Sequence, residues 1–195
     1  MSVAADRWQV WRRLGMVLIL LLVIPSVMVA RGRSLPVPAA AGDIDEEYLE
    51  PGDILFVDVY DGWSQTGYWD HIAVYVEEPY PAVVEATYNA GITLTGLEVF
   101  LDRDLPAEVS VRRLGEMPGR DEVIGAAVEF ALDQVGRAFD YTATGTLPLK
   151  LNEGNLHCAE VAWRSYRAGG LDLDSNGGLL IYPDDIYFSR ELAAP

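Results

Sequence analysis

Between residues 50 and 115, hydrophobic and polar positions recur with a period of about two, which is typical of β-strands. The clearest run is residues 52–61, where Leu55, Val57 and Val59 share one face. The segments with a strand-like pattern lie at residues 52–61, 71–78, 82–88, 92–101 and 109–114. The short "PYP" between the second and third segments predicts that these two strands form a hairpin.

Two later segments have the spacing of helices. Residues 118–136 place Val123, Ala127 and Ala131 on one face, with acidic residues in the first turn and Gly136 at the end. The pattern predicts a helix that packs against the sheet.

The second predicted helix covers residues 156–170. Cys158, Val161 and Tyr166 lie on or near one of its faces. Asn155 is the expected N-cap, and the Gly pair that begins at Gly169 is the expected end.

The remaining parts of this region carry weaker signals. Gly96 breaks the strand expected at residues 92–101, and residues 171–192 have no clear period and are expected to form a loop. The sequence therefore predicts an α+β fold, with a mostly antiparallel sheet and helices packed on one side.

The N-terminus differs in kind from the rest of the chain. Basic residues precede an uncharged apolar run from Leu14 to Ala30, and a Pro- and Ala-rich stretch follows it. This pattern predicts an export signal that is either removed or kept as a membrane anchor. We therefore expect a signal or anchor with its linker in residues 1–41, and one domain in residues 42–195.

The formal net charge of the predicted domain limits which binding partners are expected. The chain has 14 basic and 30 acidic side chains, of which residues 1–41 contain five Arg and one Asp. The predicted domain therefore carries 9 basic and 29 acidic residues, a formal charge of −20. Because a nucleic-acid surface needs positive charge, no nucleic-acid partner is expected.

Cys158 is the only cysteine of the chain, and His71 and His157 are its only histidines. With Asn155 as N-cap, Cys158 would be the third residue of its helix, where the helix dipole favours a thiolate. Neighbouring side chains on a helix point about 100° apart, so His157 is not expected to face the thiol. His71, at the start of a predicted strand, is therefore the candidate base.

The predicted hairpin indicates which group orients His71. A register that places Ala73 opposite Glu85 also places His71 opposite Thr87, with all four side chains on one face. Glu85 is then diagonal to His71, roughly 7–8 Å away along the backbone and within reach of its side chain. Thr87 is the alternative orienting group, and a slip of one residue would move Glu85 to the opposite face.

Each of these residues also has a structural explanation. Cys158 could be a buried thiol on an apolar helix face, and His71 a surface or capping residue. Glu85 is harder to explain in this way, because an unpaired carboxylate is costly to bury. The two histidines and the scattered acids show no metal-ligand spacing, so neither a metal nor a cofactor is expected.

The order of six segments resembles that of the permuted papain-like amidases of the YiiX/YaeF type, within the NlpC-type cysteine peptidase group. In chain order these segments are "GDILF", "HIAVYV", "VVEAT", "FDY", "HCAEVAWRSYRAGG" and "IYPDDI". The resemblance runs from about Pro51 to Arg190. It implies a circularly permuted papain-like core, in which the catalytic His precedes the Cys.

The resemblance also implies roles for individual residues. Cys158 would be the nucleophile, His71 the base and Glu85 the orienting group, which is the set that the spacing indicates. Backbone N–H groups at the start of the Cys158 helix would form part of an oxyanion hole. Tyr141 in "FDY" would line the substrate-binding site as an aromatic wall.

We therefore predict an exported or membrane-tethered cysteine hydrolase that cleaves an amide bond in a cell-envelope, peptidoglycan-like substrate through an acyl-enzyme. One alternative is a thioesterase or lipid deacylase/acyltransferase with the same triad, since family members resemble either cell-wall amidases or lipid acyl-transfer enzymes. Another is a non-catalytic envelope binding module, in which Glu85 pairs with Arg112 or Arg113. The expected partners are a cell-wall peptide or lipid acyl substrate, and the membrane through residues 14–30 if they are uncleaved.

Overall fold

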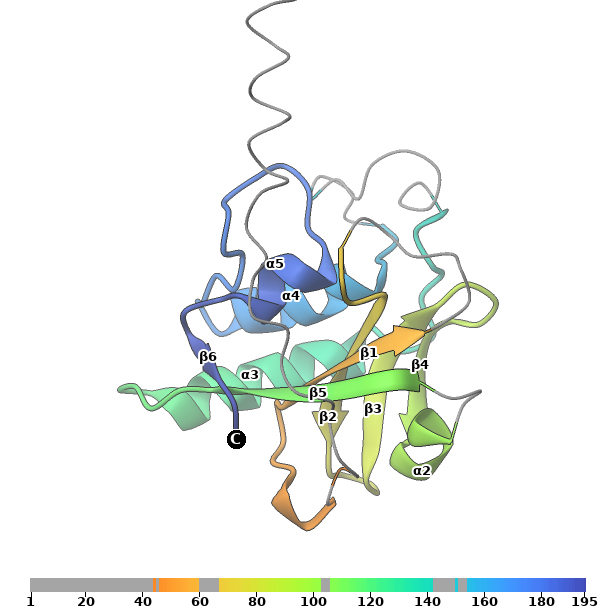
Figure 1. Cartoon of the computed structure of the whole chain (residues 1–195), viewed down its shortest axis with the longest axis horizontal. Coiled ribbons are helices and arrows are strands. Elements are labelled where there is room, and N and C mark those ends of the chain that lie inside the picture. Colours follow the sequence, from red (N-terminus) through yellow and green to blue (C-terminus); the bar gives the residue numbers. More distant parts are fainter. Residues whose placement is uncertain (1–43, 45, 60–66, 103–105, 142–149, 151–153) are drawn as a thin grey trace, which may run out of the picture. The chain divides into compact units, whose positions relative to one another are not determined.

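The computed structural model describes residues 44, 46–59, 67–102, 106–141, 150 and 154–195 (Figure 1). All elements described below belong to the unit formed by residues 40–195. The apolar segment at residues 14–30 lies outside the described residues. Within the described ranges, no helix is both long enough and apolar enough to cross a membrane.

The described strands form one antiparallel sheet of six strands in the order β4-β3-β2-β1-β5-β6 (Figure 1). Their bounds are β1 Ile54–Val59, β2 His71–Val76, β3 Ala82–Thr87, β4 Gly91–Gly96, β5 Pro106–Leu114 and β6 Leu192–Ala193. The first five correspond to the segments with strand-like spacing. The two-residue strand β6 lies in the tail that was expected to be a loop.

The β2–β3 hairpin has the predicted register. Val74 lies opposite Val84 and Tyr75 lies opposite Val83, and continuing this register places Ala73 opposite Glu85. Residues 72, 74 and 76 of β2 pack into the larger hydrophobic cluster, whereas Ala73 and Tyr75 belong to a smaller cluster on the other face. The alternation thus sets which side chains of each strand lie on the same face as Glu85.

Two longer helices cover one face of the sheet. They are α3 (Arg120–Asp133) and α4 (Cys158–Ala168), which lie on the same side in Figure 1. Their buried side chains join the larger cluster, with Ala127 of α3 and Val161, Ala162 and Tyr166 of α4 almost inaccessible to solvent. This arrangement confirms the predicted α+β fold, with helices packed on a mainly antiparallel sheet.

Three short helices complete the described elements. They are the 3-10 helix η2 (Glu46–Tyr48), α2 (Leu97–Leu101) and α5 (Pro183–Tyr187). The continuation of the fourth strand beyond Gly96 was wrong, because Leu97 and Phe100 are buried three residues apart on one side of α2. The expectation of a loop after residue 170 was also wrong at α5, which has Pro183 in its first turn, a position that suits proline.

Candidate active site

Cys158 is the first residue of α4, and the preceding His157 has the extended backbone of an N-cap, with φ −95° and ψ 175°. The expectation that Asn155 caps the helix and that Cys158 is its third residue was therefore wrong. Leu156 forms a parallel β-bridge with Phe139 and accepts a hydrogen bond from the Asp140 N–H at 3.2 Å. This pairing keeps the chain extended up to His157, so the helix begins later than its local sequence suggests.

His71 is the first residue of β2, and Glu85 lies in the middle of β3. Nε2 of His71 is 2.8 Å from Oε2 of Glu85, and the Glu85 side chain is completely buried. Of the two groups considered for orienting His71, the hydrogen bond therefore goes to Glu85 and not to Thr87. The His71 side chain is 18% exposed, so the pair lies at the margin of the core.

The second oxygen of Glu85 also has a donor. Oγ1 of Thr95, on the edge strand β4, donates a hydrogen bond of 2.6 Å to Oε1 of Glu85. Thr93 lies beside it, with its Oγ1 3.2 Å from that of Thr95. Sequence reasoning missed this role, because a threonine in a strand is ordinary and its partner lies on the neighbouring strand.

The sulfur of Cys158 lies close enough to His71 for each to change the pKa of the other. Burial raises the pKa of the Cys158 thiol, but the neighbouring His157 and His71 lower it to about 5. Burial lowers the pKa of His71, but its hydrogen bonds to Cys158 and Glu85 and their negative charges raise it to about 10. The arrangement favours a thiolate–imidazolium pair at neutral pH.

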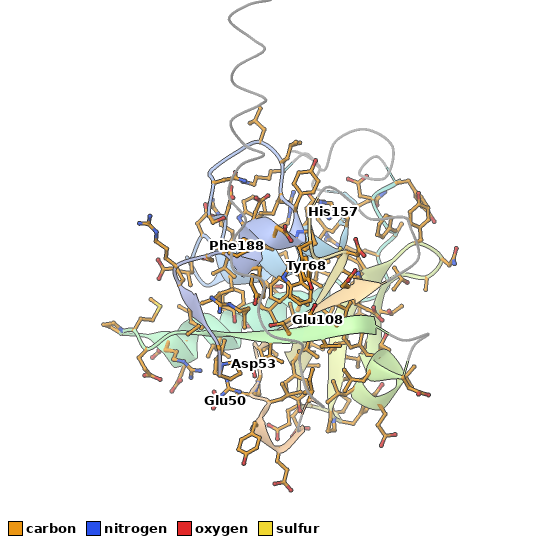
Figure 2. The ribbon with its side chains drawn as sticks, in the orientation of Figure 1. Glu50, Asp53, Tyr68, Glu108, His157 and Phe188 are labelled. Carbon is orange, nitrogen blue, oxygen red and sulfur yellow. The ribbon has the colours of Figure 1, made fainter. Side chains whose placement is uncertain are left out.

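His157 also lowers the pKa of the thiol, and the expectation that its side chain does not face Cys158 rested on a premise that the structure contradicts. That expectation assumed that both residues lie within a helix, whereas the extended backbone of His157 releases its ring from helical geometry. The ring is completely buried. In Figure 2 His157 lies toward the end of the domain that contains α4, while Asp53 and Glu50 lie toward the opposite end.

Tyr141 belongs to an aromatic cluster with Tyr88 and Phe139, whose ring centroids are 5.2–5.6 Å apart. Its hydroxyl donates a 2.6 Å hydrogen bond to the carbonyl of Tyr88, and its side chain is 56% exposed. An open groove begins at Tyr88 and runs along the β3–β4 edge, with Thr87, Thr93 and Thr95 among its lining residues. Tyr141 is thus at the surface beside the groove rather than in contact with the thiol in any described interaction.

A carboxylate that the sequence did not single out holds the loop before His71. The two oxygens of Asp184, on α5, accept hydrogen bonds from the backbone N–H groups of Tyr68 (2.8 Å) and Trp69 (2.9 Å). A Cβ on Gly67 would lie only 2.8 Å from Oδ2 of Asp184, so this contact requires a glycine there. The "IYPDDI" segment therefore has a local function in supporting the start of β2.

The arginines proposed as partners of Glu85 in a binding module have other partners. Arg113 forms a bidentate pair with Asp53, with Nε 2.8 Å from Oδ1 and Nη2 2.7 Å from Oδ2. Arg112 donates a 2.7 Å hydrogen bond to the Leu192 carbonyl. The binding-module expectation for Arg112 and Arg113 was therefore wrong.

Metal binding was tested on the same residues. Over the ranges that the model describes, no group of three or more His, Cys, Asp or Glu side chains is placed to hold a metal ion. The chemistry available at this site is that of a thiolate, two imidazoles and buried carboxylates.

Comparison with known families supports this reading of the fold. Residues 48–177 match the family model described as "Permuted papain-like amidase enzyme, YaeF/YiiX, C92 family". The crystal structure of the metalloprotein YiiX from Escherichia coli O157:H7 is similar, with a TM-score of 0.59 and 16% sequence identity. The similarity covers 75% of this chain and 96% of that chain, and it confirms the permuted papain-like fold.

The chain is also similar to a curated relative. The uncharacterized protein YycO of Bacillus subtilis strain 168 is 25% identical over 124 residues, which is 63% of this chain. The match covers 48% of YycO, so this chain spans about half the length of that relative.

Proposed function

The chain belongs to the YaeF/YiiX (C92) family of permuted papain-like amidases, and from this we propose that it is a cysteine hydrolase with Cys158 as nucleophile. His71 is the general acid and base, and Glu85 orients its imidazole. The observation that carries the proposal is the 2.8 Å contact between Nε2 of His71 and the buried carboxylate of Glu85, beside a thiol whose pKa is lowered to about 5.

The reaction proceeds in two steps. The Cys158 thiolate attacks the substrate carbonyl carbon, and the protonated His71 gives its proton to the leaving amine as the C–N bond breaks. In the second step His71 accepts a proton from water, the resulting hydroxide attacks the thioester carbonyl, and the acyl group leaves as a carboxylic acid. The Glu85 carboxylate stabilises the imidazolium that forms in each cycle.

The start of α4 supplies the group that stabilises the tetrahedral intermediate. The first N–H groups of a helix have no partner within it, and Cys158 is the first residue of α4. Its own N–H and its neighbours' therefore point toward the region where the carbonyl oxygen becomes negative. Tyr141, exposed beside the groove along β3 and β4, forms one aromatic wall for the substrate.

We propose an amide bond of a peptidoglycan-like cell-envelope substrate as the preferred target. This rests on the amidase description of the family and on the N-terminal pattern that predicts export. A thioester or lipid acyl ester is the second candidate, since the same thiolate attacks any acyl carbonyl. The relative YiiX is described as a metalloprotein, but the described residues here do not form a metal site, and no step passes through one.

The test compares the two substrate classes on one enzyme. Muropeptides and p-nitrophenyl acyl esters are incubated with the full chain and with Cys158→Ala as the matched control. Hydrolysis of muropeptides that is lost in Cys158→Ala supports the amidase, and preferential hydrolysis of the esters supports the second candidate. An unchanged rate in Cys158→Ala on either substrate would sink the proposal.

We also propose that residues 1–41 direct the domain of residues 42–195 out of the cytoplasm, either as a cleaved signal or as a membrane tether. The support is the basic-then-apolar pattern of residues 7–30. Cell fractionation of the full chain, followed by N-terminal sequencing of the extracytoplasmic product, tests it. A cytoplasmic product with an intact N-terminus would contradict both forms.

A further inference from the structure

His157 is an unusual histidine. It is completely buried, and neither ring nitrogen makes a hydrogen bond of normal geometry with any residue that the model describes. Native proteins rarely bury an imidazole without partners, and such exceptions call for an explanation, of which a catalytic role is one.

The surroundings of the ring suggest that role. On one side is Cys158, the next residue of the chain, whose thiol pKa is lowered by both His157 and His71. On the other lies Glu160, with Oε2 3.7 Å from Nε2 of His157 and 3.3 Å from its backbone N–H, which donates to it. The thiol is therefore flanked by two imidazoles, each next to a completely buried glutamate.

The charged groups around His157 and Glu160 come from three parts of the chain. On α4, Nη2 of Arg164 lies 3.5 Å from Oε1 of Glu160. Asp140, in the segment before α4, is buried and adds negative charge near Glu160. His71 reaches the thiol from β2. An imidazole carries a ring N–H whether or not it is charged, so both rings can present an N–H to the sulfur.

We propose that His157 is a second imidazole of the active site, whose ring N–H stabilises Cys158 as a thiolate while Glu160 positions the ring. This inference rests on the proposed role of Cys158 as nucleophile. Sequence spacing excluded His157 as a residue that faces the thiol. In this proposal His157 stabilises the Cys158 sulfur, whereas His71 protonates the leaving group.

The role matters most when the sulfur is the leaving group. In deacylation His71 takes a proton from water, and the hydroxide attacks the thioester carbonyl. The C–S bond then breaks and its electron pair stays on the sulfur. The thiolate that departs is held by the imidazolium of His71 and by the N–H of His157, and the starting pair is restored with no net change in protons on the enzyme.

The experiment replaces the ring in the full chain and measures the rate of Cys158 alkylation by iodoacetamide against pH. His157→Phe fills the same volume without an N–H, and His157→Gln keeps a donor. A lost hydrogen bond to a charged group raises the thiol pKa by about one to two units, so at pH 6 we expect the rate in His157→Phe to fall roughly twofold to tenfold, while His157→Gln keeps most of it. A folded His157→Phe with the unmodified profile would overturn the proposal.

A second measurement needs no substitution at residue 157. The chain has only two histidines, so nitrogen-15 labelling of histidine gives ring signals from two residues, which His71→Asn assigns. The His157 ring signals should shift when Cys158 is alkylated. His157 signals that do not change on alkylation would overturn the proposal, even if His157→Phe fails to fold.

The same alkylation curves separate this inference from the proposed function. If His71→Ala loses its reactivity at low pH and His157→Phe keeps it, the Cys158–His71 pair is supported and the role of His157 is overturned. Unchanged alkylation curves in both variants would overturn the proposed role of Cys158 as an activated nucleophile as well.

Discussion

Thr95 donates a 2.6 Å hydrogen bond from Oγ1 to Oε1 of Glu85, while Oε2 of the same carboxylate lies 2.8 Å from Nε2 of His71. Because each oxygen has its own partner, the plane of the carboxylate is fixed with one oxygen directed at the imidazole. The orientation of His71 on β2 therefore depends on β3 and on the edge strand β4.

Thr95→Val should slow the reaction of Cys158 without unfolding the domain. The substitution keeps the β-branched shape but removes the donor that fixes the Glu85 carboxylate. One net hydrogen bond corresponds to a rise of about 0.4–1.1 units in the thiol pKa of about 5, so we expect the alkylation rate of Cys158 at pH 5 to fall roughly twofold to sevenfold. Thr95→Ser keeps the hydroxyl and is the control, and equal rates in the two variants would argue against this role.

His71→Ala should move the onset of Cys158 reactivity toward alkaline pH. With the site intact, the pKa of Cys158 is lowered to about 5 and that of His71 is raised to about 10. Above pH 5 the thiol has lost its proton, and below pH 10 the imidazole still holds its own. The alkylation rate of the unmodified chain should therefore level off shortly above pH 5, and in the variant it should keep rising toward the free-thiol value of about 8.5.

The rate of substrate hydrolysis has a second limit that alkylation lacks. Acylation needs a protonated His71 to deliver a proton to the leaving group, so the rate should fall again as the pH passes about 10. A bell-shaped profile of kcat/KM in the unmodified chain, and loss of hydrolysis at every pH in His71→Ala, is the expected result. A His71→Ala variant that hydrolyses the substrate at the unmodified rate would contradict the role of His71 as acid and base.

The strands that carry His71 and Glu85 were predictable because their information is local. β2 and β3 alternate in hydrophobicity, and the short connection between them restricts the register. In the observed β2–β3 register the buried Glu85 lies next to His71, which is its hydrogen-bond partner. The position of Glu85 relative to His71 thus follows from the alternation and from the need to pair a buried charge.

The start of α4 was not predictable, because a contact distant in sequence decides it. The bridge between Phe139 and Leu156 holds the chain extended, and nothing in the local sequence "NLHCAE" predicts that bridge. Asn155 has a good capping side chain but lies two residues too early. The role of His157 was missed for the same reason, since its ring direction depends on where the helix begins. Short elements such as α5 and β6 likewise owe their formation to tertiary contacts rather than to periodicity.

Arg113→Met should destabilise the domain at a site away from the thiol. Arg113 holds Asp53 through two hydrogen bonds of 2.7 and 2.8 Å, and Asp53 is 1% exposed. The substitution leaves a buried carboxylate without its cation. The free energy of unfolding should fall by about 3 kcal/mol, the low end for a broken buried ion pair because the Arg113 side chain keeps some solvent contact.

Urea unfolding of three proteins measures this effect. Arg113→Lys keeps the charge but not the two-pronged geometry, so its free energy of unfolding should lie between those of the unmodified chain and Arg113→Met. Cys158 alkylation should be unchanged in both folded variants. A free energy of unfolding for Arg113→Met equal to that of the unmodified chain would show that Asp53 does not depend on this pair.

Gly91→Ala should destabilise the edge strand, whereas Gly125→Ala should have the opposite effect. Gly91 opens β4 with φ +74°, and a Cβ there would lie 2.3 Å from the carbonyl oxygen of Arg137, which accepts the Ile92 N–H. Both the left-handed backbone and the collision oppose alanine, so the free energy of unfolding should fall by at least about 2 kcal/mol.

Gly125 lies within α3, where a Cβ meets no atom within 4 Å, and alanine should raise the free energy of unfolding by about 0.5–1 kcal/mol through helix propensity. Urea unfolding of both variants decides the point, and a stabilised Gly91→Ala would mean that β4 does not pass as close to the turn after α3 as the structure has it.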